Sequence, residues 1–272
     1  MDDKNTALNF FLSKIGLKGK QYKEEDILDI QQIHHGFTNQ SFLLITKDQN
    51  KFQVRLGGSN DVVDRKNEAQ IIKALNDGFY LFLDKDGNAI KKWIEGDKPN
   101  FHSFKKKKLL NLLANEIKRM HEINISKSLI IKHDYFVFWK KAKLEEKHAK
   151  KYQELYEKYK DLPLVLSHND INPNNMIYNK FEKRIYLIDF EWGRINNAYW
   201  DYANFFRESN LKLKYFDYLV SLDKTLDPKI ARDFIYFCTN FALQWTYGMQ
   251  ENEKILSYRK LMLNHLEKFW FW

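Results

Sequence analysis

Cysteine is nearly absent from this chain of 272 residues, which carries a single one, Cys238. One cysteine cannot form an intramolecular disulfide, so a fold held together by disulfide bridges is excluded. No run approaches the roughly 20 apolar residues that a membrane span needs, and the first residues lack the basic and apolar regions of a secretory signal. We therefore expect a cytoplasmic protein without a membrane span.

Acidic residues are outnumbered, with 36 Asp and Glu against 45 Lys and Arg and a formal net charge of +9. The basic residues are scattered along expected helices, as at 105–108 and 140–151, with acidic residues among them. This distribution indicates a solvated surface that helps to attract an anionic nucleotide. A nucleic-acid-binding role, which the net charge alone favours, would show salt-sensitive affinity, and we expect no such partner.

Length and patterning predict an α+β fold with two lobes, because the chain is long enough for two cores. Strand-like segments alternate with one helix up to about residue 93, and helical patterning dominates afterwards. We therefore expect a small amino-terminal lobe, residues 1–95, with an antiparallel sheet and one helix. Residues 96–272 are expected to form a larger, mainly helical lobe that carries the catalytic and substrate-binding residues.

The most informative segment is Ser167–Asn175, S-H-N-D-I-N-P-N-N, which is followed by I-D-F-E at 188–191. Asp170, with Asn175 five residues later, matches the D-x-x-x-x-N pattern of a phosphoryl-transfer loop. In such a loop the Asp accepts the proton of the substrate hydroxyl and the Asn binds a magnesium ion. Asp189 is the expected second ligand of that metal.

The residues between these two motifs predict a hairpin. Two β-branched and aromatic-rich runs, 176–178 and 184–188, flank a polar turn at 179–183. Antiparallel pairing places the residue before the first strand beside the residue after the second, so Asn175 and Asp189 should meet. An ordinary turn rich in Asn, Asp and Pro is the alternative, but it leaves Asp189 unexplained.

An ion pair is expected in the amino-terminal lobe. The stretch 64–76 has the apolar spacing of an amphipathic helix, and Glu68 falls on its apolar side. A buried carboxylate needs a cationic partner, for which Arg55 on the preceding strand is the candidate. In protein kinases a Lys on that strand pairs with such a Glu and reaches the nucleotide phosphates, and Arg can do both. The alternative is an exposed Glu68 and a structural Arg55.

The nucleotide site is weakly marked. A kinase covers the ATP phosphates with G-x-G-x-x-G, whereas the turn at 35–40 has one glycine and could be an ordinary turn. A strand at 93–95 is expected to form the hinge that touches adenine through its backbone. The candidates for nucleotide binding are Gly36, Thr38, Asn39, Arg55 and Ile94.

From Ser167 to Glu208 the chain resembles the choline/ethanolamine kinase family, including its bacterial choline kinase branch. The shared motifs are H-N-D-x-N-P-x-N, I-D-F-E and D-x-A-N-x-F-x-E. The resemblance covers about residues 33–250. It implies the two-lobed fold of protein kinases and aminoglycoside phosphotransferases, with ATP and Mg²⁺ as cofactors.

The resemblance also implies roles for single residues. Asp170 would be the base, Asn175 and Asp189 the magnesium ligands, Arg55 the phosphate-binding cation and Asp201 the brace of the catalytic loop. The catalytic candidates are Asp170, Arg55 and Glu68.

Choline is a quaternary ammonium ion, which proteins hold with aromatic faces and carboxylates. The candidate substrate contacts are Asp170, Glu191, Tyr199, Trp200, Trp245 and Tyr247. The paired tryptophans typical of the family are not both present, because Trp245 stands alone between Gln244 and Thr246. Trp245 also shares a helical face with Phe234, Cys238 and Phe241, which is more typical of a core than of a ligand site.

The leading hypothesis is ATP-dependent phosphorylation of choline to phosphocholine, or of a close amino alcohol such as ethanolamine, within phospholipid metabolism. An aminoglycoside or other small-alcohol phosphotransferase is the first alternative. A non-catalytic nucleotide-binding scaffold is the second, against which the intact Asp170, Asn175 and Asp189 argue. The sequence leaves open whether the chain forms a homodimer and whether choline or ethanolamine is preferred.

Overall fold

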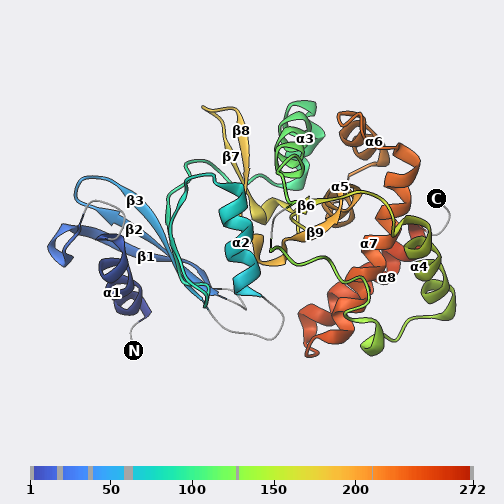
Figure 1. Ribbon diagram of the computed structural model, residues 1–272, viewed down its shortest axis with the longest axis horizontal. Helices are drawn as coiled ribbons and strands as arrows, with labels where there is room; N and C mark the ends of the chain where they lie inside the picture. The colour runs from blue at the N-terminus through green and yellow to red at the C-terminus, as the bar shows by residue number, and fades with distance from the viewer. Residues whose placement is uncertain are drawn as a thin grey trace. The chain divides into compact units, whose positions relative to one another are not determined.

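The computed structural model describes residues 3–16, 21–35, 39–57, 64–126, 129–209 and 211–269. They fall into two compact units (Figure 1). The first unit comprises Met1–Gly96, Ser126–Ile130 and Phe190–Trp192, and the second comprises the remainder of the chain.

The first unit is built on a five-stranded antiparallel sheet in the order β1-β2-β3-β5-β4. Its strands are β1 (Ile27–His35), β2 (Asn39–Thr46), β3 (Lys51–Gly57), β4 (Tyr80–Leu83) and β5 (Ala89–Lys92). The 3-10 helix η2 (Glu24–Asp26) leads into β1. Strands β2 and β3 form a hairpin in which Phe42 lies opposite Val54.

Helix α1 (Asp3–Ile15) contacts β1, β3 and β4. Its buried residues lie on one side of the helix and join the apolar core of the sheet: they are Ala7, Phe11 and Ile15. The Phe11 ring lies 5.1 Å from the Phe52 ring and 5.9 Å from the Tyr22 ring, measured between centroids. This segment precedes the residues that the family resemblance covers, and it forms an integral layer of the first unit.

Helix α2 (Arg65–Leu75) begins and ends close to the predicted 64–76. The Asp64 carboxylate caps the amino terminus by accepting a hydrogen bond from the Asn67 amide at 2.9 Å. Asn76 ends the helix in the left-handed conformation, with φ of 46°. The buried face includes Glu68, as the apolar spacing predicts.

The expected strand at 93–95 is wrong, because β5 ends at Lys92. The Trp93 amide still donates to the Lys51 carbonyl at 3.0 Å, but Lys51 is the first residue of β3. No residue of β3 remains to pair with Ile94 or Glu95, so the chain leaves the sheet there.

The second unit is mainly helical (Figure 1). Its α-helices are α3 (Lys107–His121), α4 (Glu146–Tyr159), α5 (Ala198–Glu208), α6 (Leu213–Ser221), α7 (Pro228–Gly248) and α8 (Glu253–Phe269). Two short antiparallel pairs complete it: β6 (Leu164–Ser167) with β9 (Arg194–Asn197), and β7 (Met176–Asn179) with β8 (Arg184–Leu187). The remaining 3-10 helices of the chain are η3 (Phe101–Lys105), η4 (Trp139–Lys141), η5 (Pro173–Asn175) and η6 (Phe190–Trp192).

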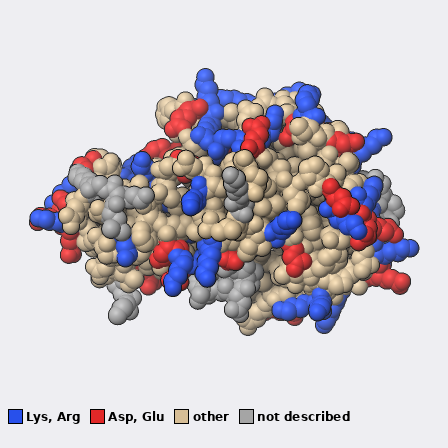
Figure 2. All heavy atoms as spheres, in the orientation of Figure 1, with Lys and Arg blue, Asp and Glu red and all other residues tan. Residues whose placement is uncertain are grey.

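Helix α7 is the central helix of this unit, since α4, α5, α6 and α8 all contact it. Phe234 and Phe237 of α7 are nearly inaccessible, as are Trp200 and Phe205 of α5. Within the described ranges, no helix is both long and apolar enough to cross a bilayer. On the face shown in Figure 2, basic side chains are interspersed with acidic ones.

Candidate active site

The β7–β8 hairpin brings the two expected metal ligands together, as predicted. Met176 pairs with Leu187, and the Ile188 amide donates to the Asn175 carbonyl at 3.0 Å. Asn175 therefore lies opposite Ile188, the residue directly before Asp189. This hairpin geometry is confirmed, while the metal-binding role of the two side chains stays a prediction.

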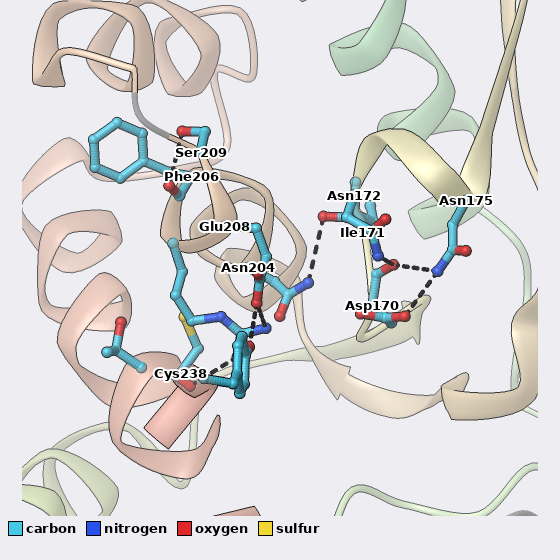
Figure 3. Close-up of polar contacts among 12 residues, drawn as sticks. Asp170, Ile171, Asn172, Asn175, Asn204, Phe206, Glu208, Ser209 and Cys238 are labelled. Carbon is cyan, nitrogen blue, oxygen red and sulfur yellow. Dashed lines mark hydrogen bonds and ion pairs between the residues drawn. The ribbon is translucent and has the colours of Figure 1, made fainter. Parts of the chain in front are cut away.

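Asp170 and Asn175 are in direct contact (Figure 3). The Asn175 Nδ2 atom donates to Asp170 Oδ2 at 2.7 Å and to the Asp170 carbonyl at 3.0 Å. Because both contacts use the amide nitrogen, Oδ1 of Asn175 is the atom that remains to bind a cation.

Two features of Asp189 are unfavourable for the stability of the folded chain. Its φ of 68° lies in the left-handed region, which is uncommon for a residue other than glycine. Its Oδ1 atom is buried and has no hydrogen-bond partner among the described residues. A buried carboxylate oxygen without a partner is destabilising, and such strain is concentrated at functional sites. An amide oxygen and a carboxylate are the ligands that magnesium prefers, so these residues fit that ion.

Asp201 of α5 holds the loop that contains Asp170. It accepts hydrogen bonds from the His168 amide at 3.1 Å, the Asn169 amide at 2.9 Å and the His121 ring at 2.9 Å. Burial by itself would raise the pKa of Asp201, but these donors outweigh it and hold the pKa below its ordinary value. The contacts agree with the bracing role that the family resemblance implied.

His168 fastens the same loop to the hairpin. Its Nε2 atom donates to the Ile188 carbonyl at 3.0 Å, and its Nδ1 atom accepts from the Asp170 amide at 3.3 Å. Burial lowers the pKa of His168, which favours the neutral ring that one donor and one acceptor require. The chain on either side of the Asp170–Asn175 contact is thus fixed.

The Asp170 carboxyl has an unusual pKa. Burial raises it to about 7, and the nearby charges of Glu208 and Asp189 add to the rise, while Arg207 and the Asn175 hydrogen bond oppose it. A carboxylate with a pKa near neutral pH is suited to accept a proton in a general-base step.

Glu208 is a candidate that the sequence reasoning did not select, although it closes the motif D-x-A-N-x-F-x-E. One turn earlier on α5, the side-chain Nδ2 atom of Asn204 donates a hydrogen bond to the carbonyl of Ile171, the residue after Asp170, at 3.4 Å (Figure 3). Residues four apart lie on the same face of a helix, so Glu208 continues the face that touches the loop. The spacing from Asn204 was the signal in the sequence.

The Glu208 carboxylate is held by two donors. Its Oε1 atom accepts from Arg207 Nη2 at 2.6 Å and from the Tyr258 hydroxyl. Trp245 of α7 meets the Tyr258 ring edge to face at 6.0 Å between centroids, and it is half-buried. The Trp245 Nε1 atom has no partner among the described residues. Glu208, Tyr258 and Trp245 therefore form a cluster that supplies a carboxylate and an indole face.

Three other expected substrate contacts lie in different surroundings. Trp200 is 1% exposed and packs in the aromatic core against Phe237 and Phe241. Tyr199 is buried, and its hydroxyl accepts a hydrogen bond from the Asp227 amide at 2.9 Å. The Arg259 guanidinium lies over the Tyr247 ring at 4.2 Å from the centroid. These placements suit structural roles, and a role in substrate binding stays a prediction for all three residues.

In the first unit, Arg55 and Glu68 form the expected ion pair. Arg55 Nη1 lies 2.7 Å from Glu68 Oε1 and Nη2 lies 3.0 Å from Oε2, while Nε donates to the Gly87 carbonyl at 2.9 Å. Both side chains are buried, which excludes the alternative of an exposed Glu68. Burial would raise the pKa of Glu68, but Arg55 and Arg65 together hold the pKa below its ordinary value.

Arg65 is a second cation of this cluster that the sequence reasoning missed. Its Nη1 atom lies 2.9 Å from Glu68 Oε2 and 3.4 Å from Glu191 Oε2. Glu191, expected as a substrate contact, is thus a partner of Arg65. Gly87 has a φ of 84°, and a Cβ atom there would lie 2.6 Å from Arg65 Cδ, so a side chain at this position would be strained and would displace Arg65. The i, i+3 spacing of Arg65 and Glu68 was the available signal.

The positions of the other candidates for nucleotide binding do not reveal their roles. Gly36 and Thr38 lie outside the described residues. Asn39 begins β2 opposite Gly57, and Ile94 is half-buried in irregular chain after β5. Their roles stay predictions.

The sequence profile of the family described as Choline/ethanolamine kinase matches residues 30–271. The chain belongs to this family. It is 32% identical over 273 residues to the "Uncharacterized protein MG356 homolog" of Mycoplasma pneumoniae, covering 98% of this chain and 93% of that protein. It is also 28% identical over 214 residues to a "Probable ethanolamine kinase" of Arabidopsis thaliana, covering 68% of this chain and 57% of that protein.

Among solved structures, the choline kinase LicA from Streptococcus pneumoniae superimposes with a TM-score of 0.74 at 18% identity, covering 97% of this chain and 99% of LicA. This similarity shows the fold. The predicted α+β kinase-like fold is thereby confirmed: a five-stranded antiparallel sheet with a helix is followed by a mainly helical part. The amino-terminal part carries helix α1 in addition to the one helix that the sequence predicted.

Proposed function

We propose that this protein is an ATP-dependent kinase that phosphorylates the hydroxyl group of a small amino alcohol, choline or ethanolamine. The observation that carries the proposal is the contact between Asp170 and Asn175 beside Asp189, whose buried oxygen has no partner among the described residues. Membership of a kinase family supports the same reaction type. We further propose that residues 1–95 bind the nucleotide and that residues 96–272 supply the catalytic and substrate-binding groups.

Asp170 is the proposed proton acceptor. The side-chain amide of Asn175 orients the Asp170 carboxylate by donating a hydrogen bond to Asp170 Oδ2. Burial raises the pKa of Asp170 to about 7, so this carboxylate takes up a proton readily near neutral pH. Asn175 and Asp189 are the residues that would hold magnesium. When bound, that ion neutralises charge on the phosphates.

Arg55 is the proposed phosphate-binding cation of the first unit. Glu68 and the Gly87 carbonyl fix its guanidinium from three sides, so its charge is held in one place before a nucleotide binds. Fixed charges stabilise a phosphoryl group better than mobile ones because they need no reorganisation.

The proposed site for the ammonium group is the cluster of Glu208, Tyr258 and Trp245. Glu208 supplies negative charge, and Trp245 supplies the aromatic face on which cations bind best. This assignment replaces Tyr199, Trp200 and Tyr247, whose faces and hydroxyls serve the protein's own packing.

The experiment is a measurement of ATP turnover with choline, ethanolamine, thiamine and aminoglycosides, followed by mass spectrometry of the product. We expect phosphorylated choline or ethanolamine from the wild-type protein, and a rate of product formation about 10²–10⁴-fold lower from Asp170→Ala. Phosphorylation of an aminoglycoside alone would replace the proposal by the first alternative. ATP binding without phosphorylation of any acceptor would favour the non-catalytic scaffold.

A further inference from the structure

Arg207 of α5 is a buried cation beside the proposed ammonium site, with an exposed fraction of 6%. Its Nη2 atom donates to Glu208 Oε1 at 2.6 Å, and its Nη1 atom donates to the Cys238 carbonyl at 3.1 Å. Its Nε atom is buried without a partner among the described residues. Burying a guanidinium that is incompletely hydrogen-bonded is destabilising, and an apolar side chain would fill the same space at lower free-energy cost.

The contacts of Arg207 leave Glu208 with two unlike oxygens. Oε1 accepts from both Arg207 and the Tyr258 hydroxyl, whereas no hydrogen bond from the described residues reaches Oε2. The Glu208 side chain is 20% exposed. Oε2 is therefore an accessible acceptor whose position is fixed by the two hydrogen bonds to Oε1 of the same carboxylate.

Arg207 also offsets the charge of Glu208. Two opposite charges at this separation act on a third, more distant charge largely as a dipole, so the attraction of Glu208 for a cation is weakened. The directed hydrogen bond to Oε2 remains. A protonated amine can donate that bond, whereas a quaternary ammonium carries no N–H and must rely on charge and aromatic faces. In the described cluster the indole of Trp245 is the principal such face.

We infer that Arg207 is a specificity-determining residue, which positions Glu208 and offsets its charge so that the site favours amino alcohols with an N–H group over quaternary ones. The inference rests on the proposed function, whose amino alcohol site it refines. Arg207 acts through Glu208 and is a positioning residue.

The test compares N,N-dimethylethanolamine with choline, which differ by one methyl group, while only the former has an N–H when protonated. For the wild-type protein we expect kcat/KM to be about tenfold or more higher for N,N-dimethylethanolamine, as a hydrogen bond to a charged group provides. Ethanolamine and N-methylethanolamine should have kcat/KM values similar to that of N,N-dimethylethanolamine. The decrease in kcat/KM should therefore appear only when the third methyl group, which gives choline, is added.

Two variants then test Arg207 itself. In Arg207→Met the freed carboxylate attracts any cation, so the KM for choline should fall. Oε2 is no longer held, so the preference for the N–H substrate should narrow to about threefold or less, as the directed bond weakens. Arg207→Lys keeps the charge and should keep most of the preference. A purely structural loss would lower kcat/KM for both substrates equally and leave their ratio unchanged.

An unchanged ratio in a folded Arg207→Met protein would overturn the inference, as would a wild-type preference for choline. The wild-type comparison needs no variant, so the inference is testable even if Arg207→Met does not fold. If the wild-type protein phosphorylates no amino alcohol, the proposed function fails instead, and the two failures are distinguishable.

Discussion

The amide nitrogen of Asn175 lies within hydrogen-bond distance of two atoms of Asp170, 2.7 Å from Oδ2 and 3.0 Å from the carbonyl. The Asn175 side chain therefore holds together the two ends of the segment from Asp170 to Asn175. The orientation of the proposed base is coupled to the position of a proposed metal ligand, so a change at either residue should affect both.

Asp170→Ala should lower kcat by about 10²–10⁴-fold, because the variant lacks the group that accepts the hydroxyl proton. Binding of ATP should change little, since Asp170 acts on the acceptor alcohol. Steady-state turnover together with calorimetric titration of nucleotide checks both. A variant with more than about a tenth of wild-type kcat would remove Asp170 from the base role.

Asp170→Asn should stabilise the metal-free protein, and the gain should depend on pH. Burial raises the pKa of folded Asp170 to about 7, above the value of about 3.9 in an unfolded chain. Between these values the unfolded chain loses the proton first, so the free energy of unfolding falls as pH rises and then levels off. The gain from Asp170→Asn should therefore be small at pH 4 and reach at most about 4 kcal/mol at pH 8.

Thermal or urea unfolding in EDTA at several pH values measures this gain. Metal must be absent because a bound cation would shift the same pKa. Equal stabilisation at pH 4 and pH 8 would show that the Asp170 carboxyl is not perturbed in the folded chain.

Asp189→Gly should raise the magnesium concentration needed for half-maximal activity by about tenfold or more, because the carboxylate ligand is lost. The same change should stabilise the metal-free protein by about 1–2 kcal/mol, since glycine adopts the left-handed conformation without strain and no carboxylate oxygen is left buried. The matched control is Lys183→Gly, at another left-handed position, with φ of 54°. It should leave the magnesium dependence unchanged.

Arg65→Met and Glu191→Gln should show energetic coupling, because Arg65 Nη1 contacts both Glu68 and Glu191. A double-mutant cycle on the free energy of unfolding should give an interaction of about 0.5–3 kcal/mol. Arg65→Lys should lower the free energy of unfolding less than Arg65→Met does, since lysine keeps one charged contact. Additive effects of the two single changes would show that the 3.4 Å contact contributes nothing.

Trp245→Ala should raise the KM for choline about 5–30-fold, from roughly 1–2 kcal/mol of cation–π energy, and leave the KM for ATP unchanged. The matched control is Trp200→Ala, in the aromatic core, which should lose about 3–5 kcal/mol of stability and affect both substrates. Thermal melts beside the kinetics separate the two cases. A folded Trp245→Ala protein with an unchanged KM for both choline and ethanolamine would move the ammonium site away from α7.

Local patterns predicted the parts of the site that are close in sequence. The spacing of Asp170, Asn175 and Asp189 across a short hairpin required no knowledge of tertiary packing. Arg55 and Glu68 followed from one helical periodicity and from the need to neutralise a buried carboxylate. The family profile, which matches residues 30–271, spans all of these motifs.

The aromatic residues could not be assigned in this way. Tyr199 and Trp200 stand close to the motif in sequence, but packing of α5 against α7 buries both. Tyr258 contacts Glu208 from a position 50 residues away on another helix. Which aromatic ring is core and which is available to a ligand is decided by helix packing, for which the sequence offers no local signal.

Helix α1 has a practical consequence for producing the protein. The family profile starts at residue 30, so an expression plasmid designed from the profile alone would omit Phe11 and Tyr22. Their rings cover Phe52, and removing them would leave a solvent-facing apolar surface on the sheet. Such a truncated polypeptide would be prone to aggregate in the host cell, and its failure to yield active material would say nothing about catalysis.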